Sequence, residues 1–226
     1  MAFPPLIPYC PPRFPPDEML RRAEQFFAEV NSRRSVREFS DESVPKRLIE
    51  LAIATASTAP SGAHRQPWRF VAIDDAQLKQ RIRAAAEKEE YESYEGGRMP
   101  GEWREAVAPF RTNWEKPFLE TAPWLVVVFE EVYGHDAQGE KQKNYYVKES
   151  VGIACGLFIT ALHHMGLATL THTPSPMNFL NELCNRPDNE RPYILFPVGY
   201  PADNAQVPDL QRKPLSKVVT WNPTTK

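Results

Sequence analysis

Glycine is scarce in this sequence, at only 10 of 226 residues. The sequence has no glycine-rich phosphate loop and no G-x-G-x-x-G after a predicted strand, which excludes a built-in nicotinamide-binding unit of that kind. Cysteine is scarcer still, with three residues and no C-x-x-C pair. That pattern predicts neither a disulfide framework nor a cysteine zinc site, and it indicates a reducing compartment, the cytoplasm. The histidines lack carboxylates at metal-ligand spacing, so no metal is expected.

Long hydrophobic runs are missing as well. The longest, Trp124–Phe129 and Ile153–Leu162, are far shorter than the roughly 20 residues that span a bilayer. The proline-interrupted N-terminus has no basic region and no apolar stretch of a secretory signal. A net charge of −2 and a pI near 6.2 give no general electrostatic reason to bind nucleic acid or an anionic membrane. We therefore expect a cytoplasmic protein with neither of these partners.

The composition is that of an ordinary folded domain. Hydrophobic residues make up 42% and charged residues 25%, and a chain of this length can bury a core without disulfide or metal support. Proline is frequent, at 23 residues. It is densest in residues 1–16, which we expect to form an extended arm because proline removes the amide donor and fixes φ.

Apolar periodicity predicts both helices and strands. Helices are expected over 17–30, 45–56, 76–94, 102–119 and 145–165. Strands are expected over 68–73, 124–129, 168–172, 193–198 and 215–221. Asp17 is expected to cap the first helix and Gly166 to end the last, while the unbroken apolarity of 124–129 indicates a strand covered on both faces. The pattern predicts an α+β fold of three layers, with helices around a small sheet.

Three arginines and a serine form a dense cluster at Arg33, Arg34, Ser35 and Arg37. Guanidinium groups make charge-assisted bonds to phosphate oxygens, so the cluster is a candidate phosphate clamp. A solvated basic helix end is the alternative for the same residues.

A short loop of small residues, Thr58–Trp68, follows a predicted helix and precedes a predicted strand. Its Ser61 hydroxyl and the amides of Gly62 and Ala63 are donors where the backbone could approach a planar ligand. An ordinary turn is the alternative.

Arg-Arg-Ser-Val-Arg at 33–37 and Ala-Pro-Ser-Gly-Ala-His at 59–64 are the first of a series of short motifs. Others lie at 111–114, 121–123, 145–146, 153–156, 171–174, 197–201 and 207–214. In this order and spacing they resemble the flavin-dependent nitroreductase superfamily and, more narrowly, its iodotyrosine deiodinase family. The resemblance extends from about Asp17 to Leu215.

The resemblance implies a nitroreductase-like three-layer sandwich with a mostly antiparallel central sheet. It also implies an intertwined homodimer with FMN at the subunit interface. The chain would then comprise a proline-rich arm (1–16), an FMN-binding domain (17–214) with a lid at about 87–118, and a C-terminal extension (215–226).

The same resemblance implies roles for individual residues. The implied FMN-binding residues are Arg33, Arg34, Ser35, Arg37, Pro60, Ser61, Thr171, His172, Thr173 and Arg212. Two of the implied residues act on the reaction itself: Thr173 donates near flavin N5, and the Ala63 amide meets the substrate phenolate. These assignments are chemically reasonable, because a phosphate dianion requires fixed cations and a flavin N5 accepts a hydroxyl donor.

Three further residues distinguish the deiodinases from other nitroreductases. Glu90, Tyr94 and Lys116 match the residues that bind the amino-acid zwitterion of the substrate. Glu90 and Tyr94 are four residues apart and share one helix face. The polar second half of the predicted helix 76–94 is then understandable as a lid over ligand. For Glu90 the alternative is a solvated acidic run.

The resemblance therefore implies FMN-dependent reductive dehalogenation of a halotyrosine, with NAD(P)H or a separate reductase as electron donor. A broad-specificity NAD(P)H-dependent nitroreductase or quinone reductase with the same flavin site is the alternative enzyme. A non-catalytic flavin-binding or basic-segment interaction protein is the third hypothesis.

Overall fold

The computed structural model describes residues 4–223. By its internal contacts the chain divides into two compact units, Met1–Arg33 and Arg34–Lys226. No helix among the described residues is long and apolar enough to span a bilayer.

The first unit holds an extended stretch and one helix, α1 (Pro16–Ser32). The helix begins one residue earlier than expected, because Pro15 takes the N-cap position and Pro16 fits the first turn. Asp17 is therefore not the cap; it lies in the first turn, where its charge complements the helix dipole. The larger apolar side chains of α1, namely Met19, Leu20, Phe26 and Phe27, are all more than half exposed.

The second unit is built on a four-stranded sheet with every pairing antiparallel. The strands, in spatial order, are β1 (Trp68–Ile73), β2 (Trp124–Glu131), β6 (Glu190–Gly199) and β5 (Ala168–Thr169). A separate hairpin pairs β3 (Tyr133–His135) with β4 (Lys141–Lys143). The expected mostly antiparallel α+β architecture is confirmed.

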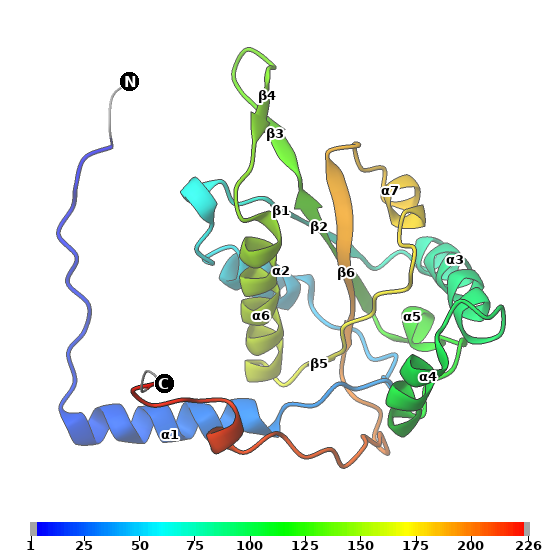
Figure 1. The fold of residues 1–226 in the computed structure, drawn as a ribbon, viewed down its shortest axis with the longest axis horizontal. Coiled ribbons are helices and arrows are strands. Elements are labelled where there is room, and N and C mark those ends of the chain that lie inside the picture. The colour runs from blue at the N-terminus through cyan, green and yellow to red at the C-terminus, as the bar shows by residue number, and fades with distance from the viewer. Residues whose placement is uncertain (1–3, 224–226) are drawn as a thin grey trace. The chain divides into compact units, whose positions relative to one another are not determined.

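Helices cover both faces of this sheet (Figure 1). One face packs against α2 (Lys46–Ala56) and α6 (Val147–His164). The other packs against α3 (Ala76–Tyr94), α5 (Phe118–Thr121) and α7 (Phe179–Leu183).

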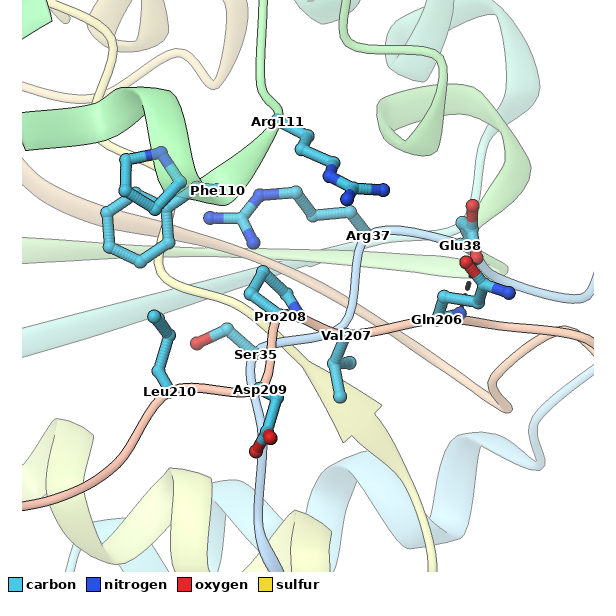
Figure 2. A pocket seen from close by; sticks show the side chains of 11 residues that line it. Ser35, Arg37, Glu38, Phe110, Arg111, Gln206, Val207, Pro208, Asp209 and Leu210 are labelled. Carbon is cyan, nitrogen blue, oxygen red and sulfur yellow. Dashed lines mark hydrogen bonds between the residues drawn. The ribbon is translucent and has the colours of Figure 1, made fainter. Parts of the chain in front are cut away.

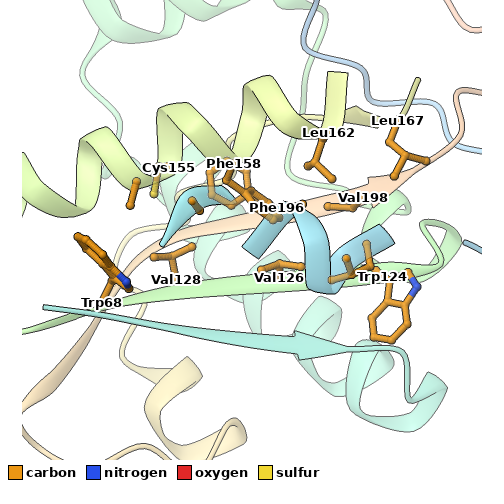
Figure 3. Packing of buried hydrophobic residues seen from close by; sticks show 14 of the residues in the cluster. Trp68, Trp124, Val126, Val128, Cys155, Phe158, Leu162, Leu167, Phe196 and Val198 are labelled. Carbon is orange, nitrogen blue, oxygen red and sulfur yellow. The ribbon is translucent and has the colours of Figure 1, made fainter. Parts of the chain in front are cut away.

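The position of β2 in the centre of the sheet explains why its sequence is continuously apolar. Its residues alternate between the two faces, as strand geometry requires. Val126 and Val128 point to the α2/α6 core, where Figure 3 shows them beneath Phe158 of α6. Val127 and Phe129 join the core on the other face. The prediction of a strand covered on both sides is confirmed.

The stretch 102–119 is not one helix. It forms α4 (Gly101–Val107), a 3₁₀ turn η2 (Ala108–Phe110) and, after an irregular segment, α5. Pro109 removes an amide donor, and Arg111 takes the left-handed conformation at φ +50°. These two residues end helical geometry and send the chain in a new direction.

Other differences concern whole elements. The expected strand 215–221 is wrong: the chain forms a 3₁₀ turn, η3 (Leu215–Lys217), closed by local bonds such as Lys217 N–H to Pro214 O. The hairpin and α7 were not expected. The hairpin turn depends on Asp136, whose carboxylate accepts the Gln138 and Glu140 amides. Gly166, at φ +78°, follows α6 as expected.

Candidate active site

A first cavity of about 560 Å³ lies where three stretches of chain meet. Its walls are Ser35, Arg37 and Glu38, residues 109–111 at η2, and residues 206–210 before η3. Hydrogen bonds fix these stretches: the Val36 amide donates to Thr169 O of β5 (3.2 Å), and the Gln206 amide donates to the Glu38 carboxylate (2.7 Å; Figure 2). The bond to Thr169 places the Ser35–Glu38 wall of the cavity at the β5 edge of the sheet.

Arg37 is one of two arginines that line this cavity, the other being Arg111; Glu38 and Asp209 are its acidic lining residues. Figure 2 shows the Arg37 side chain extending toward Phe110, and the guanidinium carbon lies 5.7 Å from that ring's centroid. Partial burial lowers the pKa of Arg37. No ion pair within residues 4–223 joins this guanidinium to a carboxylate. A desolvated cation without an acidic partner fits an anionic ligand such as a phosphate.

Arg34 and Arg212 adjoin the lining residues of this cavity in the sequence. Arg34 directly precedes Ser35, and Arg212 follows the lining residue Leu210 by two positions. Neither is among the lining residues. Arg33 is the last residue of the first unit.

A second cavity, of about 170 Å³, shares Arg37 with the first. It is bounded by α3, α4, the irregular segment 111–117 and the chain after β5. Glu90, Tyr94 and Lys116, the three residues expected to bind a zwitterion, all line it. The structure thus brings together residues from distant parts of the chain.

Lys116 is the most deeply buried of the three, with 3% of its side chain exposed. Its Nζ lies 3.2 Å from Glu90 Oε2 and also donates to Thr112 Oγ1 and to Asn113 O. The ammonium is 5.2 Å from the Tyr94 ring centroid. Burial lowers the pKa of Lys116, against the opposing effect of Glu90. Here two opposite charges neutralise each other inside a small polar pocket.

Residues Thr171–Thr173 also line the second cavity. The His172 amide and carbonyl both bond to Leu195 (2.9 and 3.0 Å), so the segment extends β6 pairing by one bridge. Side chains alternate accordingly: His172 is 6% exposed, whereas Thr171 and Thr173 are on the exposed side.

His172 is the buried residue of this segment. Its ring packs edge-on against Phe118 with centroids 5.6 Å apart, and Nε2 is buried without a hydrogen-bond partner. Burial, with Lys116 and Arg37 nearby, lowers the pKa of His172 to about 3. Both backbone groups of His172 bond to Leu195, and His172 is among the residues that line the second cavity.

The loop of small residues lies on the other side of the sheet. Figure 1 shows its cyan turn, η1 (Gly62–His64), at the N-terminal end of α6, across the sheet from α3. The expectation that the Gly62 amide is open to a ligand is wrong, because it donates to Ser150 Oγ (3.3 Å). A side chain at Gly62 could not fit, since a Cβ there would lie 2.5 Å from Tyr145 O.

Ser61 and Ala63 of the same loop differ in their hydrogen bonding. Ser61 Oγ accepts the Gln66 amide (2.9 Å). The Ala63 amide has no hydrogen bond among the described residues, and Ala63 and His64 have φ of +50° and +53°. Strained backbone of this kind is characteristic of functional loops. Pro60, Ser61 and Ala63 line neither cavity described above.

The sequence reasoning missed several residues that line the second cavity. They are Ser93, Met99, Trp103, Val107, Thr112 and Phe118. Thr112 belongs to the Arg-Thr-Asn-Trp motif at 111–114, so the family motif could have indicated it as a site residue. Within residues 4–223, no group of three or more His, Cys, Asp or Glu side chains is arranged to hold a metal ion.

Comparisons with known proteins agree on one family. A model described as "Nitroreductase family" matches residues 30–200. The chain is 56% identical over 216 residues to an iodotyrosine deiodinase of Haliscomenobacter hydrossis, covering 96% of this chain and 97% of that protein. It is 45% identical over 218 residues to the Danio rerio iodotyrosine deiodinase, covering 95% and 73%.

A solved structure extends the likeness to three dimensions. It is the crystal structure of oxidized iodotyrosine deiodinase bound to FMN and 3-iodo-L-tyrosine. Its TM-score against this chain is 0.76 at 32% identity, covering 88% of this chain and all of that one.

Proposed function

Because the chain belongs to the nitroreductase family and, within it, to the iodotyrosine deiodinases, we propose that it is an FMN-dependent reductive dehalogenase of halotyrosine. In the net reaction, two electrons and one proton replace a carbon–halogen bond by a carbon–hydrogen bond and release halide. FMN, when bound and reduced, supplies the two electrons.

The first cavity suits the cofactor. Arg37 presents a partly desolvated cation that forms no ion pair among residues 4–223, and Ser35 adds a hydroxyl to the same lining. We assign Arg33, Arg34 and Arg212 to the same phosphate-binding group, on their position in the family motifs. Thr171 and Thr173, whose side chains alternate with the buried His172, are assigned to the flavin ring, with Thr173 donating near N5.

The buried Lys116–Glu90 pair is the observation that carries the choice of substrate. A zwitterion presents one ammonium and one carboxylate, which match Glu90 and Lys116 charge for charge, with the Tyr94 hydroxyl beside them. In a pocket with little solvent these interactions are stronger than in water. A ligand with only one of the two charges would leave a buried partner unpaired.

A lid formed by about residues 87–118 accounts for where these groups lie. Glu90 and Tyr94 belong to the end of α3, and Lys116 belongs to the irregular segment that follows η2. Glu90 and Tyr94 follow Ala86, the last buried residue of α3, so the end of this helix can close over a ligand without disturbing the core.

A homodimer would bring the two halves of the site together. Pro60, Ser61 and Ala63 lie across the sheet from Glu90 and Lys116, so one chain alone does not assemble them. We assign the partner copy's loop to complete the site, with Ser61 and Pro60 beside FMN and the open Ala63 amide donating to the substrate phenolate. The exposed apolar side chains of α1 are suited to such an interface.

The electron donor is assigned as NAD(P)H or a separate reductase, since the sequence has no dinucleotide-binding glycine motif. A cytoplasmic location is supported by the cysteines, because Cys10, Cys155 and Cys184 are all unpaired.

The proposal is tested by titrating the oxidised FMN-loaded protein with iodotyrosine and, separately, with a nitroaromatic, while flavin fluorescence is recorded. We expect saturable quenching by iodotyrosine and turnover to tyrosine and iodide. Tight binding and reduction of the nitroaromatic, with neither for iodotyrosine, would favour the broad nitroreductase instead. A purified protein without bound yellow flavin would contradict both.

A further inference from the structure

One face of α3 carries more polar residues than the two expected to bind substrate. Arg83, Glu87, Glu90 and Tyr94 follow one another at spacings of four, three and four, so all four lie on a single stripe of the helix. The C-terminal half of this stripe faces the second cavity. The N-terminal half, Arg83 and Glu87, has no part in the proposed substrate contacts.

Glu87 holds the backbone of Lys116. Its Oε1 accepts the Lys116 amide at 2.6 Å, and it also accepts Arg83 Nε at 2.8 Å. The Lys116 carbonyl in turn accepts the Leu119 amide (3.0 Å), at the start of α5. Lys116 therefore connects the irregular segment 111–117 to α3 through its amide and to α5 through its carbonyl.

Arg83 keeps the Glu87 carboxylate available for this contact. It pairs with Glu87 and, at 3.3 Å, with Glu120, and the hydrogen bond to Glu87 raises the pKa of Arg83. With its charge offset by Arg83, Glu87 holds the Lys116 amide while Glu90 holds the Lys116 ammonium. Two carboxylates of one helix thus fix both ends of the same lysine.

The attachment of α3 to the rest of the fold does not depend on Glu87. Ile82 and Ala86 are fully buried in the core, and the Lys79 ammonium donates to the carbonyls of Glu120 and Ala122 (3.0 and 2.8 Å). The Glu87–Lys116 bond adds little to that packing. Its specific effect is on where Lys116 lies.

We propose that Glu87 is a positioning residue for substrate recognition: by gripping the Lys116 amide, it sets the Lys116 ammonium at the distance from Glu90 that accepts an amino-acid zwitterion. This inference rests on the proposed function for the identity of the ligand. The grip on Lys116 itself exists without ligand and can be measured without it.

The experiment uses the FMN-loaded protein and three variants: Glu87→Ala, Glu87→Gln, which keeps an acceptor oxygen, and Glu92→Ala as control. Glu92 is an exposed carboxylate on a different face of the same helix. Hydrogen exchange at the Lys116 amide is measured without substrate; Pro117 has no amide, so the signal there is not mixed with that of the next residue. Binding of iodotyrosine and of iodophenol is then measured by flavin fluorescence.

Glu87→Ala should speed exchange at Lys116 and weaken iodotyrosine binding, each by about tenfold, the loss of one hydrogen bond to a charged group. Iodophenol, which lacks the zwitterion, should bind as it does to the parent. Glu87→Gln should restore slow exchange and most of the iodotyrosine affinity, and Glu92→Ala should match the parent.

Unchanged exchange at Lys116 in Glu87→Ala would overturn the inference whatever the ligand is. So would equal weakening of iodotyrosine and iodophenol, which is the result of general damage. If Glu87→Ala does not fold, Glu87→Gln decides: it keeps an acceptor oxygen for the Lys116 amide, so fast exchange at Lys116 in this variant would overturn the inference. A parent protein that fails to bind iodotyrosine defeats the proposed function but leaves the exchange result to judge Glu87.

Discussion

The Lys116 ammonium lies 3.2 Å from the Glu90 carboxylate, with 3% and 13% of the two side chains exposed. Each is the other's charge partner in the absence of ligand. Glu90→Gln and Lys116→Gln should therefore each weaken iodotyrosine binding by about 2–5 kcal/mol, because the remaining charge is left poorly paired. A halophenol measured on the same preparations should respond little. Equal losses for both ligands would contradict a zwitterion site.

Loss of Arg37 should remove the cofactor. Arg37→Ala is expected to purify largely without flavin, because a phosphate would lose charge-assisted bonds worth about 1.5–3 kcal/mol each. The ratio of flavin to protein absorbance measures this. Arg47→Ala is the control, since Arg47 is an exposed arginine whose ion pair, among the residues that the structure describes, is with Glu50 on α2. Stoichiometric flavin in Arg37→Ala would remove this residue from the cofactor site.

Thr173 should affect the rate and not the affinity. Thr173→Ala is expected to keep FMN and to bind iodotyrosine like the parent, while reduced flavin is reoxidised by iodotyrosine more slowly. The reason is that the Thr173 hydroxyl is proposed to donate near flavin N5. Thr173 is on the exposed side of the segment, opposite the buried His172. Stopped-flow absorbance follows the reoxidation, and Thr173→Ser should recover it. A parent-like rate in Thr173→Ala would argue against a flavin contact.

His172 should make the fold sensitive to acid. Its pKa is lowered to about 3 in the folded chain, from 6.5 without burial. The unfolded chain therefore binds a proton that the folded chain refuses, and this contribution to stability is complete above about pH 6.5 and is lost progressively toward pH 3. The melting temperature of His172→Asn, measured across this range, should fall less steeply with acid than that of the parent. Parallel curves would show that another group controls the acid limb.

Two defective chains should complement each other in a dimer. Arg37→Ala disrupts the cofactor side of the site, and Gly62→Val displaces the loop on the other side of the sheet, where a Cβ would lie 2.5 Å from Tyr145 O. Each homodimer should be inactive. The heterodimer, isolated with two different tags, should regain one of its two sites. An inactive heterodimer, or a flavin-loaded monomer by light scattering, would contradict a shared site.

Much of the fold was readable from the sequence. The short apolar run of β2 predicts a buried strand, and the long helical pattern of α3 predicts a helix; the structure contains both elements. The single helix expected over 102–119 failed because amphipathic spacing continues through Pro109 and Arg111, where the backbone turns. The β3–β4 hairpin was missed because its second strand is the polar Lys141–Lys143, which has no apolar alternation to detect.

For the candidate site, too, some features could be predicted from the sequence and others could not. The i, i+4 spacing of Glu90 and Tyr94 was enough to place them on one face, and the structure gives the position of the predicted Lys116: its ammonium is 3.2 Å from Glu90 Oε2 and 5.2 Å from the Tyr94 ring centroid. The inward direction of His172 could not be foreseen, because it depends on the pairing of this segment with Leu195. The engagement of Gly62 with Ser150 joins residues 88 positions apart, which no local pattern reveals.

Arg37 lines both cavities, and its positive charge contributes to lowering the pKa of Lys116. An anion that neutralises Arg37 in the first cavity removes this repulsion, so Lys116 holds its own proton, and a ligand carboxylate, more readily. The occupants of the two cavities are thus energetically coupled through one guanidinium. Such coupling is reciprocal by linkage: an anion bound in the first cavity strengthens the binding of a carboxylate in the second, and that carboxylate strengthens the binding of the anion by the same factor.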